Sequence, residues 1–294
     1  MAGKRLFLFI FITLIIIFSG VQSESADVII IGDFRLKPIN DIVTLIRELL
    51  PSEVVVYLPK DVKGILNSVV RKENAKVVIT LGGEPTNDAL SLPESVPIIY
   101  GLLIKPAITK RQNITGVYMA TPVSEYIVLL ERYFPNIRKL GIVLEPETGN
   151  LLLHEASSTS VTLYRAHNSY EFIKGINHLG GNIDAFLLLP EKNLLTATAM
   201  EELYRHSFKE KVPVIGVSEK HVKMGSLIAL VFDESGMGKQ IGELAQKVLS
   251  RGNASGIPPA PPERFNLYLN IETAKKMKIN ISPDLIKKAR GTYP

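Results

Sequence analysis

The sequence predicts an α/β protein made of two similar lobes, each with a parallel sheet. From Asp27 onward, short β-branched runs alternate with amphipathic segments of roughly 10–15 residues, which is typical of βαβ units with right-handed crossovers. This alternation begins again near residue 120, and 294 residues suit two lobes of roughly 120 residues each. A hydrophobic content of 46% and a charged content of 21% are typical of a packed globular chain.

The first lobe is predicted from strands and helices in alternating order. The expected strands are 27–31, 54–58, 75–81 and 96–103, and the expected helices are 38–50, 60–72 and 86–90. The second lobe opens on a helix at 123–134, whose apolar residues Val123, Ile127, Leu130 and Phe134 form a stripe that faces a core. It continues with strands at 140–144, 161–164 and 185–189 and a helix at 196–211.

The stretch from Lys211 to Gly242 is the most informative part of the chain. It holds two apolar runs, 212–217 and 226–232, each too short for a helix. Between them, Ser218 is expected to start a helix and Gly225 to end it. Asp233 follows the second strand, where the ligand crevice of an open α/β sheet forms. The stretch is therefore expected to form one wall of a cleft.

The lobes are expected to be discontinuous in sequence. Lobe 1 is predicted from residues 24–118 plus 234–264, and lobe 2 from residues 119–233 plus 265–294. The first two crossings are placed near 116–121 and 232–236. The helix 237–249 returns to lobe 1, and the Pro-rich segment 257–262 leads to a strand at 265–270 and a terminal helix. Several crossings between two lobes form a hinge that can close around a ligand.

Residues 1–23 have the layout of a secretory signal peptide. Lys4 and Arg5 precede an apolar run from Leu6 to Phe18, and cleavage is expected after Ser23. The run is shorter than the roughly 20 residues that span a bilayer, and an uncleaved anchor is the alternative. Cysteine is absent, which excludes disulfides, thiol catalysis and a lipoprotein anchor. The expected location is therefore the periplasm, as a soluble protein.

The charge of the chain does not indicate nucleic-acid binding. The formal net charge of +5 falls by two, to about +3, when Lys4 and Arg5 are removed with the leader. The remaining excess is scattered, and the Lys275-Lys276 and Lys287-Lys288 clusters are expected on solvated helix faces.

Three blocks of the sequence resemble one family. The run NITGVYMATPVSEYIVLLERYFPNIRKLGIVLEPETGN (113–150), the segment 212–242 and the run NLYLNIETAKKMKINISPDLIKKA (266–289) are similar to ABC-transporter substrate-binding proteins, including tryptophan- and tyrosine-binding members. The resemblance implies a type I periplasmic-binding-protein fold with two Rossmann-like lobes. It also implies an amino-acid-like or other small solute as ligand, ABC permease subunits in the inner membrane as partners, and no cofactor.

The sequence departs from the family pattern mainly at the expected ligand contacts. Glu84-Pro85 stands where the family usually has Thr-Pro, and Leu144-Glu145 replaces Tyr-Asn. Glu191-Lys192 replaces Thr-Asp, although Asn193 is kept, and Glu234-Ser235 replaces an aromatic pair after Asp233. The resemblance therefore extends to the scaffold more than to the recognition of a free amino acid. The chain between Asn150 and Asp184 is also several residues short of the family pattern, which would trim a helix of lobe 2.

The candidate ligand-binding residues follow strands or start helices. In each case a structural explanation stands beside ligand contact: a turn for Gly83, a helix cap for Thr121 and Asp233, and a solvated loop for Glu145 and its neighbours. The glycines at 82–83 permit close approach of a ligand, but the Glu84 carboxylate opposes an anion and favours a cationic or hydroxyl-rich one. The full set is Gly83, Glu84, Thr86, Thr121, Glu145, Thr148, Asn150, Asn193, Ser218 and Asp233.

Catalysis and nucleotide binding receive little support from the motifs. The five histidines lack metal-ligand spacing, there is no Gly-x-Ser-x-Gly elbow, and the glycines at 82–83 match no nucleotide fingerprint. Glu84 and Glu145 could meet across the cleft for acid–base work, and His221 is expected to face solvent on a helix. The expected function is solute binding for an ABC importer. The alternative is a relative with a degenerate pocket that serves protein interaction or sensing in the envelope.

Overall fold

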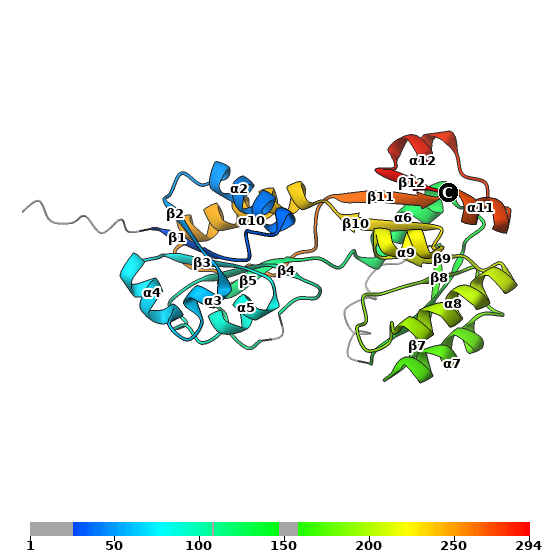
Figure 1. The fold of residues 1–294 in the computed structure, drawn as a ribbon, viewed down its shortest axis with the longest axis horizontal. Helices are drawn as coiled ribbons and strands as arrows, with labels where there is room; N and C mark the ends of the chain where they lie inside the picture. The colour runs from blue at the N-terminus through cyan, green and yellow to red at the C-terminus, as the bar shows by residue number, and fades with distance from the viewer. Residues whose placement is uncertain (1–25, 108, 147–157) are drawn as a thin grey trace, which may run out of the picture.

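The computed structural model describes residues 26–107, 109–146 and 158–294. Within these ranges the chain forms two lobes, each an open sheet with helices packed on both faces (Figure 1). The predicted two-lobed α/β architecture is confirmed. The expected leader, residues 1–23, lies outside the described residues.

The first lobe holds a five-stranded, all-parallel sheet in the order β2-β1-β3-β4-β5. Its strands are β1 (Val28–Ile31), β2 (Val54–Tyr57), β3 (Val77–Leu81), β4 (Ile98–Leu103) and β5 (Ile114–Tyr118). Its helices are α2 (Lys37–Leu49), α3 (Pro59–Val62), α4 (Leu66–Glu73), α5 (Gly83–Ala89) and α10 (Glu234–Arg251). Helices α2 and α10 share one face of the sheet, while α3, α4 and α5 cover the other (Figure 1).

The second lobe holds a seven-stranded sheet in the order β12-β11-β10-β9-β8-β6-β7. Its strands are β6 (Lys139–Leu144), β7 (Ser160–Arg165), β8 (Ala185–Leu187), β9 (Val214–Gly216), β10 (Ile228–Phe232), β11 (Phe265–Asn270) and β12 (Gly291–Tyr293). Its helices are α6 (Val123–Tyr133), α7 (Ser169–Leu179), α8 (Ala197–Glu210), α9 (Glu219–Met224), α11 (Ile271–Met277) and α12 (Pro283–Lys288). All neighbouring strands are parallel except β10 and β11.

The two sheets repeat one topology. Strands β1 to β5 lie in the order 2-1-3-4-5, and strands β6 to β10 lie in the same order when they are counted from β6. In this doubly wound arrangement the strand order reverses between the first and third strands, and ligands bind at the carboxyl ends of those strands. The topology therefore gives each lobe one expected ligand edge: β1 and β3 in lobe 1, and β6 and β8 in lobe 2.

Three chain segments cross between the lobes. The first joins β5 to α6, the second joins β10 to α10 at Asp233, and the third runs from α10 to β11 (Figure 1). Along the third segment, Ala260 forms a parallel bridge with Val117, so the Pro-rich segment extends the edge of the first sheet. The second and third crossings touch, because the backbone N–H of Asp233 donates to the Arg264 carbonyl at 2.9 Å.

Helix α10 returns to lobe 1 by docking closely on α2. Met237 and Ile241 of α10 are fully buried with Ile42 and Ile46 of α2. Gly242 brings the helices together, because a Cβ atom there would lie 2.8 Å from Leu49 Cδ1. Burial of this apolar face fixes the C-terminal half of the chain onto the N-terminal lobe.

Several predicted elements need correction. The single helix expected at 60–72 is two helices, α3 and α4, because Gly64 between them has a φ of 77° that ends the first one. The segment 114–118, which overlaps the first expected crossing, pairs as β5 with β4. Strand β11 runs antiparallel to β10, and the helix α7 and the edge strand β12 were not assigned from the sequence.

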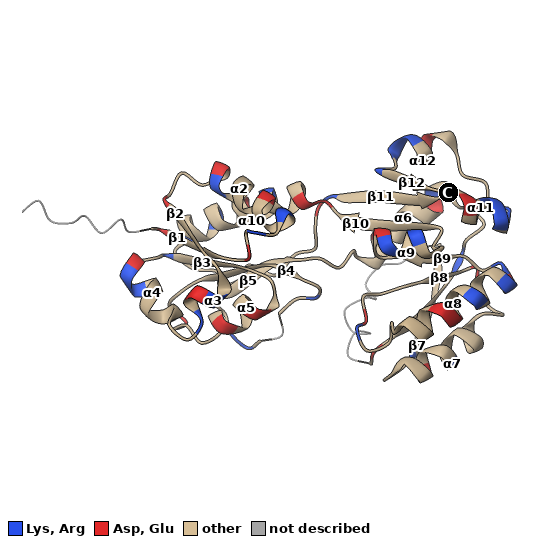
Figure 2. Ribbon diagram, viewed as in Figure 1, with Lys and Arg blue, Asp and Glu red and all other residues tan. Residues whose placement is uncertain are grey.

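Basic and acidic residues are interspersed along the helices and loops of both lobes (Figure 2). The Lys275-Lys276 and Lys287-Lys288 clusters are exposed on α11 and α12, as predicted. Lys276 pairs with Glu272 at 3.5 Å, and Lys288 pairs with Asp284 at 2.9 Å. No helix among the described residues combines the length and apolar character that crossing a bilayer requires.

Candidate functional site

In lobe 1 the ligand edge includes the turn from β3 into α5. Gly82 has a φ of 113° and precedes the first helical residue, Gly83. Gly83 and Glu84 are exposed, and the Glu84 carboxylate lies 2.8 Å from Lys63 Nζ. The nearby Glu84 carboxylate raises the pKa of Lys63. Glu84 therefore has a cation of its own at this edge.

Thr86 supports the same turn from inside the lobe. It is buried, and its hydroxyl donates to the Gly82 carbonyl at 2.7 Å and lies 2.9 Å from the Thr80 hydroxyl. These bonds hold the positive-φ glycine against the end of β3. In this conformation Thr86 shapes the loop that carries Gly83 and Glu84, and its direct contact with a ligand stays a prediction.

In lobe 2 the structure brings two predicted residues together. Glu145 follows β6, Asn193 follows β8, and the Asn193 side-chain amide donates to Glu145 Oε1 at 2.9 Å. Their strands are neighbours at the point where the strand order reverses. Two other candidates in this loop, Thr148 and Asn150, lie outside the described residues.

An ion pair that was not predicted links the two lobes. Lys105 follows β4 in lobe 1, Glu191 follows β8 in lobe 2, and Lys105 Nζ lies 2.6 Å from Glu191 Oε2. The Glu191 side chain is 1% exposed and that of Lys105 is 32% exposed. The pair shows that the ends of β4 and β8 face each other across the two lobes. In the sequence, the only signal for it is that each residue closely follows a predicted strand.

The loop after β1 also belongs to this edge and was missed. Arg35 makes a two-pronged contact with Asp33, with Nε to Oδ1 at 2.7 Å and Nη2 to Oδ2 at 2.6 Å. This contact lowers the pKa of the Asp33 carboxyl. The sequence signal for this ion pair was the position of Asp33, two residues beyond the first strand, at the edge where the strand order reverses between β1 and β3.

Thr121 and Asp233 lie in the crossings. The Thr121 hydroxyl donates to the Leu230 carbonyl at 3.1 Å, which ties the first crossing to β10. Asp233 caps α10, because its Oδ2 accepts from the Gly236 N–H at 2.8 Å, and its Oδ1 accepts from the Asn266 amide at 3.2 Å. The cap predicted at Asp233 is thus confirmed. The cap expected at Thr121 is wrong, because Pro122 is the N-cap residue of α6 and the Thr121 hydroxyl is bonded to β10 instead. The ligand contacts of both residues stay predictions.

Ser218 caps α9, and this helix turns His221 inward. Ser218 Oγ accepts from the His221 N–H at 3.2 Å, and Gly225 ends the helix, as predicted. The expectation that His221 faces solvent is wrong: its side chain is half-buried, and Nδ1 accepts from the Val217 N–H at 3.3 Å. Burial lowers the pKa of His221 to about 4, with a smaller contribution from Lys220. His221 is therefore neutral near pH 7.

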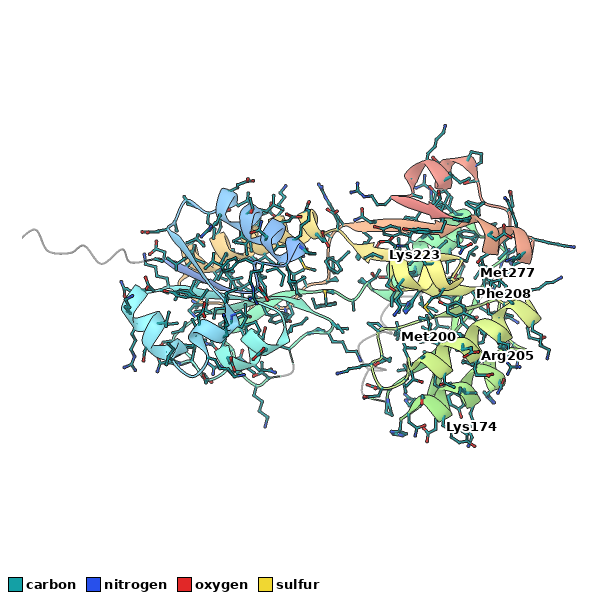
Figure 3. All side chains as sticks on the ribbon, in the orientation of Figure 1. Lys174, Met200, Arg205, Phe208, Lys223 and Met277 are labelled. Carbon is teal, nitrogen blue, oxygen red and sulfur yellow. The ribbon has the colours of Figure 1, made fainter. Side chains whose placement is uncertain are left out.

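The outer end of lobe 2 lies apart from these residues. Arg205 of α8 and Met277 of α11 lie at the end of lobe 2 remote from lobe 1 (Figure 3). Among the residues that the structure describes, no group of three or more histidine, aspartate or glutamate side chains is placed to hold a metal ion. The polar side chains at these strand ends form hydrogen bonds and ion pairs, and the Lys105–Glu191 pair joins the two lobes.

Two doubly wound lobes, three crossings and polar strand ends that meet between the lobes define a two-lobed binding protein of the type I periplasmic class. The chain belongs to the family described as ABC transporter substrate binding protein, whose profile matches residues 59–292. It is 24% identical to an uncharacterized protein of Rickettsia prowazekii over 291 residues, which cover 94% of this chain and 92% of that protein.

Two solved structures share the fold at low sequence identity. A substrate-binding protein with adhesive properties from Clostridium difficile, in its ligand-free, open form, is 16% identical with a TM-score of 0.64, covering 90% of this chain and 98% of that one. The ABC domain from Streptococcus pneumoniae in complex with L-Trp is 15% identical with a TM-score of 0.54, covering 90% and 99%. The predicted type I periplasmic-binding-protein fold is therefore confirmed.

Proposed function

We propose that this protein is the solute-binding component of an ABC importer and that it closes by hinge motion on a small molecule between its lobes. The observation that carries the proposal is the pairing of two doubly wound lobes by three crossings, with the ends of β4 and β8 in contact through Lys105 and Glu191. Family membership over residues 59–292 supports it. Ligand binding between such lobes uses the strand ends of both.

The crossings suit a hinge because each lobe has its own core. Separate clusters of buried side chains lie on the two faces of each sheet, so either lobe can move as a body. The Asp233 and Arg264 backbones hold the second and third crossings together. A rotation between the lobes would then be confined to the few residues at the ends of β5, β10 and the third crossing.

The proposed location and partners rest on the leader expected from the sequence and on the family. A chain with a signal peptide at residues 1–23 and without cysteine would be released into the periplasm and would deliver its solute to permease subunits in the inner membrane. The Streptococcus pneumoniae domain binds L-Trp. Glu84, Glu145 and Glu191 stand at this chain's strand ends, so its ligand need not be an aromatic amino acid.

Thermal melting with a panel of solutes tests solute binding. A ligand that binds only the folded state raises the melting midpoint, by an amount that grows with ligand concentration over Kd. The panel would hold amino acids, sugars, nucleosides, polyols and amines, each at about 1 mM, and small-angle X-ray scattering with and without a hit would follow closure. We expect one class to raise the midpoint and to reduce the radius of gyration.

The alternative function makes the opposite prediction. An envelope interaction or sensing module would show no shift with any solute, and a pull-down from membranes would instead recover a protein partner. A midpoint shift without any change in the radius of gyration would leave solute binding standing and would reject hinge closure.

A further inference from the structure

Glu191 is a buried carboxylate with one oxygen that lacks a donor. Its side chain is 1% exposed, and Oε2 is held by Lys105 at 2.6 Å. The other oxygen, Oε1, is buried and accepts no hydrogen bond from any residue that the structure describes. A buried carboxylate oxygen without a donor is destabilising, and such atoms are rare in native proteins. Glu191 is therefore built to accept one more N–H or O–H group.

The charge of Glu191 is already balanced from the opposite lobe. Lys105 supplies a full positive charge at ion-pair distance, and its stem leaves the end of β4. A second cation at Oε1 would lie close to the Lys105 ammonium, in surroundings where solvent screens repulsion weakly. An anion would be repelled by Oε1 itself. A neutral donor group meets neither repulsion.

Carboxylates at other strand ends also have polar or charged partners. Asp33 is held by Arg35 at 2.6 Å, and Glu84 is held by Lys63 at 2.8 Å. Glu145 accepts a hydrogen bond from the Asn193 amide at 2.9 Å and has no cation partner within the described part of the chain. Three of these four carboxylates thus have their own cation, which leaves little net charge to select an ionic ligand.

We propose that Glu191 is the ligand-selecting residue and that its Oε1 accepts a hydrogen bond from an uncharged small molecule rich in hydroxyl or amide donors. Lys105 holds Oε2 from the other lobe, so the same carboxylate binds the ligand and the closing lobe. This inference rests on the proposed solute-binding function. It differs from recognition of a free amino acid, whose ammonium group would compete with Lys105.

The test uses the mature protein and probes of three charge classes. Isothermal titration would compare uncharged probes (monosaccharides, polyols, nucleosides and primary amides) with zwitterionic amino acids and cationic polyamines, together with any small molecule that native mass spectrometry finds on the purified protein. We expect an uncharged probe to bind. We also expect Glu191→Gln to raise the Kd of that probe by about tenfold or more, because hydrogen bonds to charged acceptors are stronger than those to neutral ones.

A charge-swapped variant distinguishes ligand recognition by Glu191 from an ion pair that only holds the two lobes together. The double variant K105E/E191K keeps an ion pair between the lobes but places only donors on lobe 2. We expect it to melt close to the wild type and to lose the uncharged probe. Equal Kd values of the uncharged probe for the swapped variant and the wild type would overturn the inference, because the ion pair would then only hold the lobes together. If the swapped variant does not fold, the E191Q variant is used instead, and a Kd equal to that of the wild type would overturn the inference.

Different results would overturn the role of Glu191 and the solute-binding function. Binding of an amino acid or polyamine, with E191Q leaving its Kd unchanged, would overturn the role of Glu191 while solute binding stands. Failure of every probe to bind the wild type would overturn the proposed solute-binding function, and this inference with it.

Discussion

Asn266 donates its side-chain amide to Asp233 Oδ1 at 3.2 Å, which joins the start of β11 to the start of α10. The same carboxylate caps α10 through Gly236. One side chain thus ends the second crossing, caps a lobe-1 helix and contacts the start of β11, where the third crossing ends. This placement makes Asp233 a candidate for coupling the stability of α10 to the angle between the lobes.

Asp233→Ala is expected to lower the free energy of unfolding by about 1 kcal/mol, because an N-cap is lost. The matched control is Asn168→Ala, which removes the cap of α7 in lobe 2, where Asn168 accepts from the Glu171 N–H at 2.9 Å. Urea unfolding should show similar losses for both variants, whereas scattering should show a changed radius of gyration for Asp233→Ala alone. Identical scattering curves would count against a hinge role for Asp233.

Lys105→Met is expected to destabilise the protein by about 2–3 kcal/mol, since it leaves the Glu191 carboxylate buried and unpaired. The double variant K105M/E191L should recover most of this loss, because both charges are gone. Urea unfolding of the single and double variants measures the coupling between the two residues. Lys63→Met, at the exposed pair with Glu84, is the control and should destabilise the protein much less, because solvent screens an exposed pair. A Lys105→Met variant as mild as the control would contradict the buried position of the pair.

His221 is expected to make stability depend on pH between about 6.5 and 4. Its pKa in the folded state is about 4, below the usual value of 6.5, so over this window the unfolded chain binds a proton that the folded one does not. Stability therefore falls as the pH drops from 6.5 to 4, by up to about 3 kcal/mol from this group. Urea titrations at several pH values should show a smaller slope for His221→Gln than for the wild type. An equal slope in the variant and the wild type would contradict the buried setting of the His221 ring.

Gly116→Ala is expected to destabilise lobe 1 by about 1–3 kcal/mol, because overpacking forces the backbone to shift. A Cβ atom at Gly116 would lie 2.3 Å from the Tyr100 carbonyl oxygen, on the neighbouring strand β4. Gly181→Ala is the control, since a Cβ atom there meets nothing within 4 Å. Thermal melting should separate the two variants by several degrees, and equal midpoints would show that β4 and β5 can move apart at no cost.

Part of the site could be predicted from the chain alone. Residues that follow apolar runs lie at strand ends, which predicts the position of Glu145. Asn193 was a candidate through the family resemblance, and only the structure shows that it donates to Glu145. Capping residues were predictable for the same local reason, as Ser218 and Asp233 show. The partner of Glu191 was not predictable, because Lys105 is 86 positions away and belongs to the other lobe.

The sequence by itself determined the alternating α/β pattern, the two-lobed organisation and the positions of most strands, since these follow from hydrophobic periodicity and turn residues. It did not determine the antiparallel direction of β11 or the break at Gly64, where pairing partners and a positive φ decide. Only the tertiary structure decided that His221 turns inward and that Glu191 is buried against Lys105. Burial and charge pairing depend on residues far apart in the chain, and a local sequence pattern does not indicate which distant residues will be in contact.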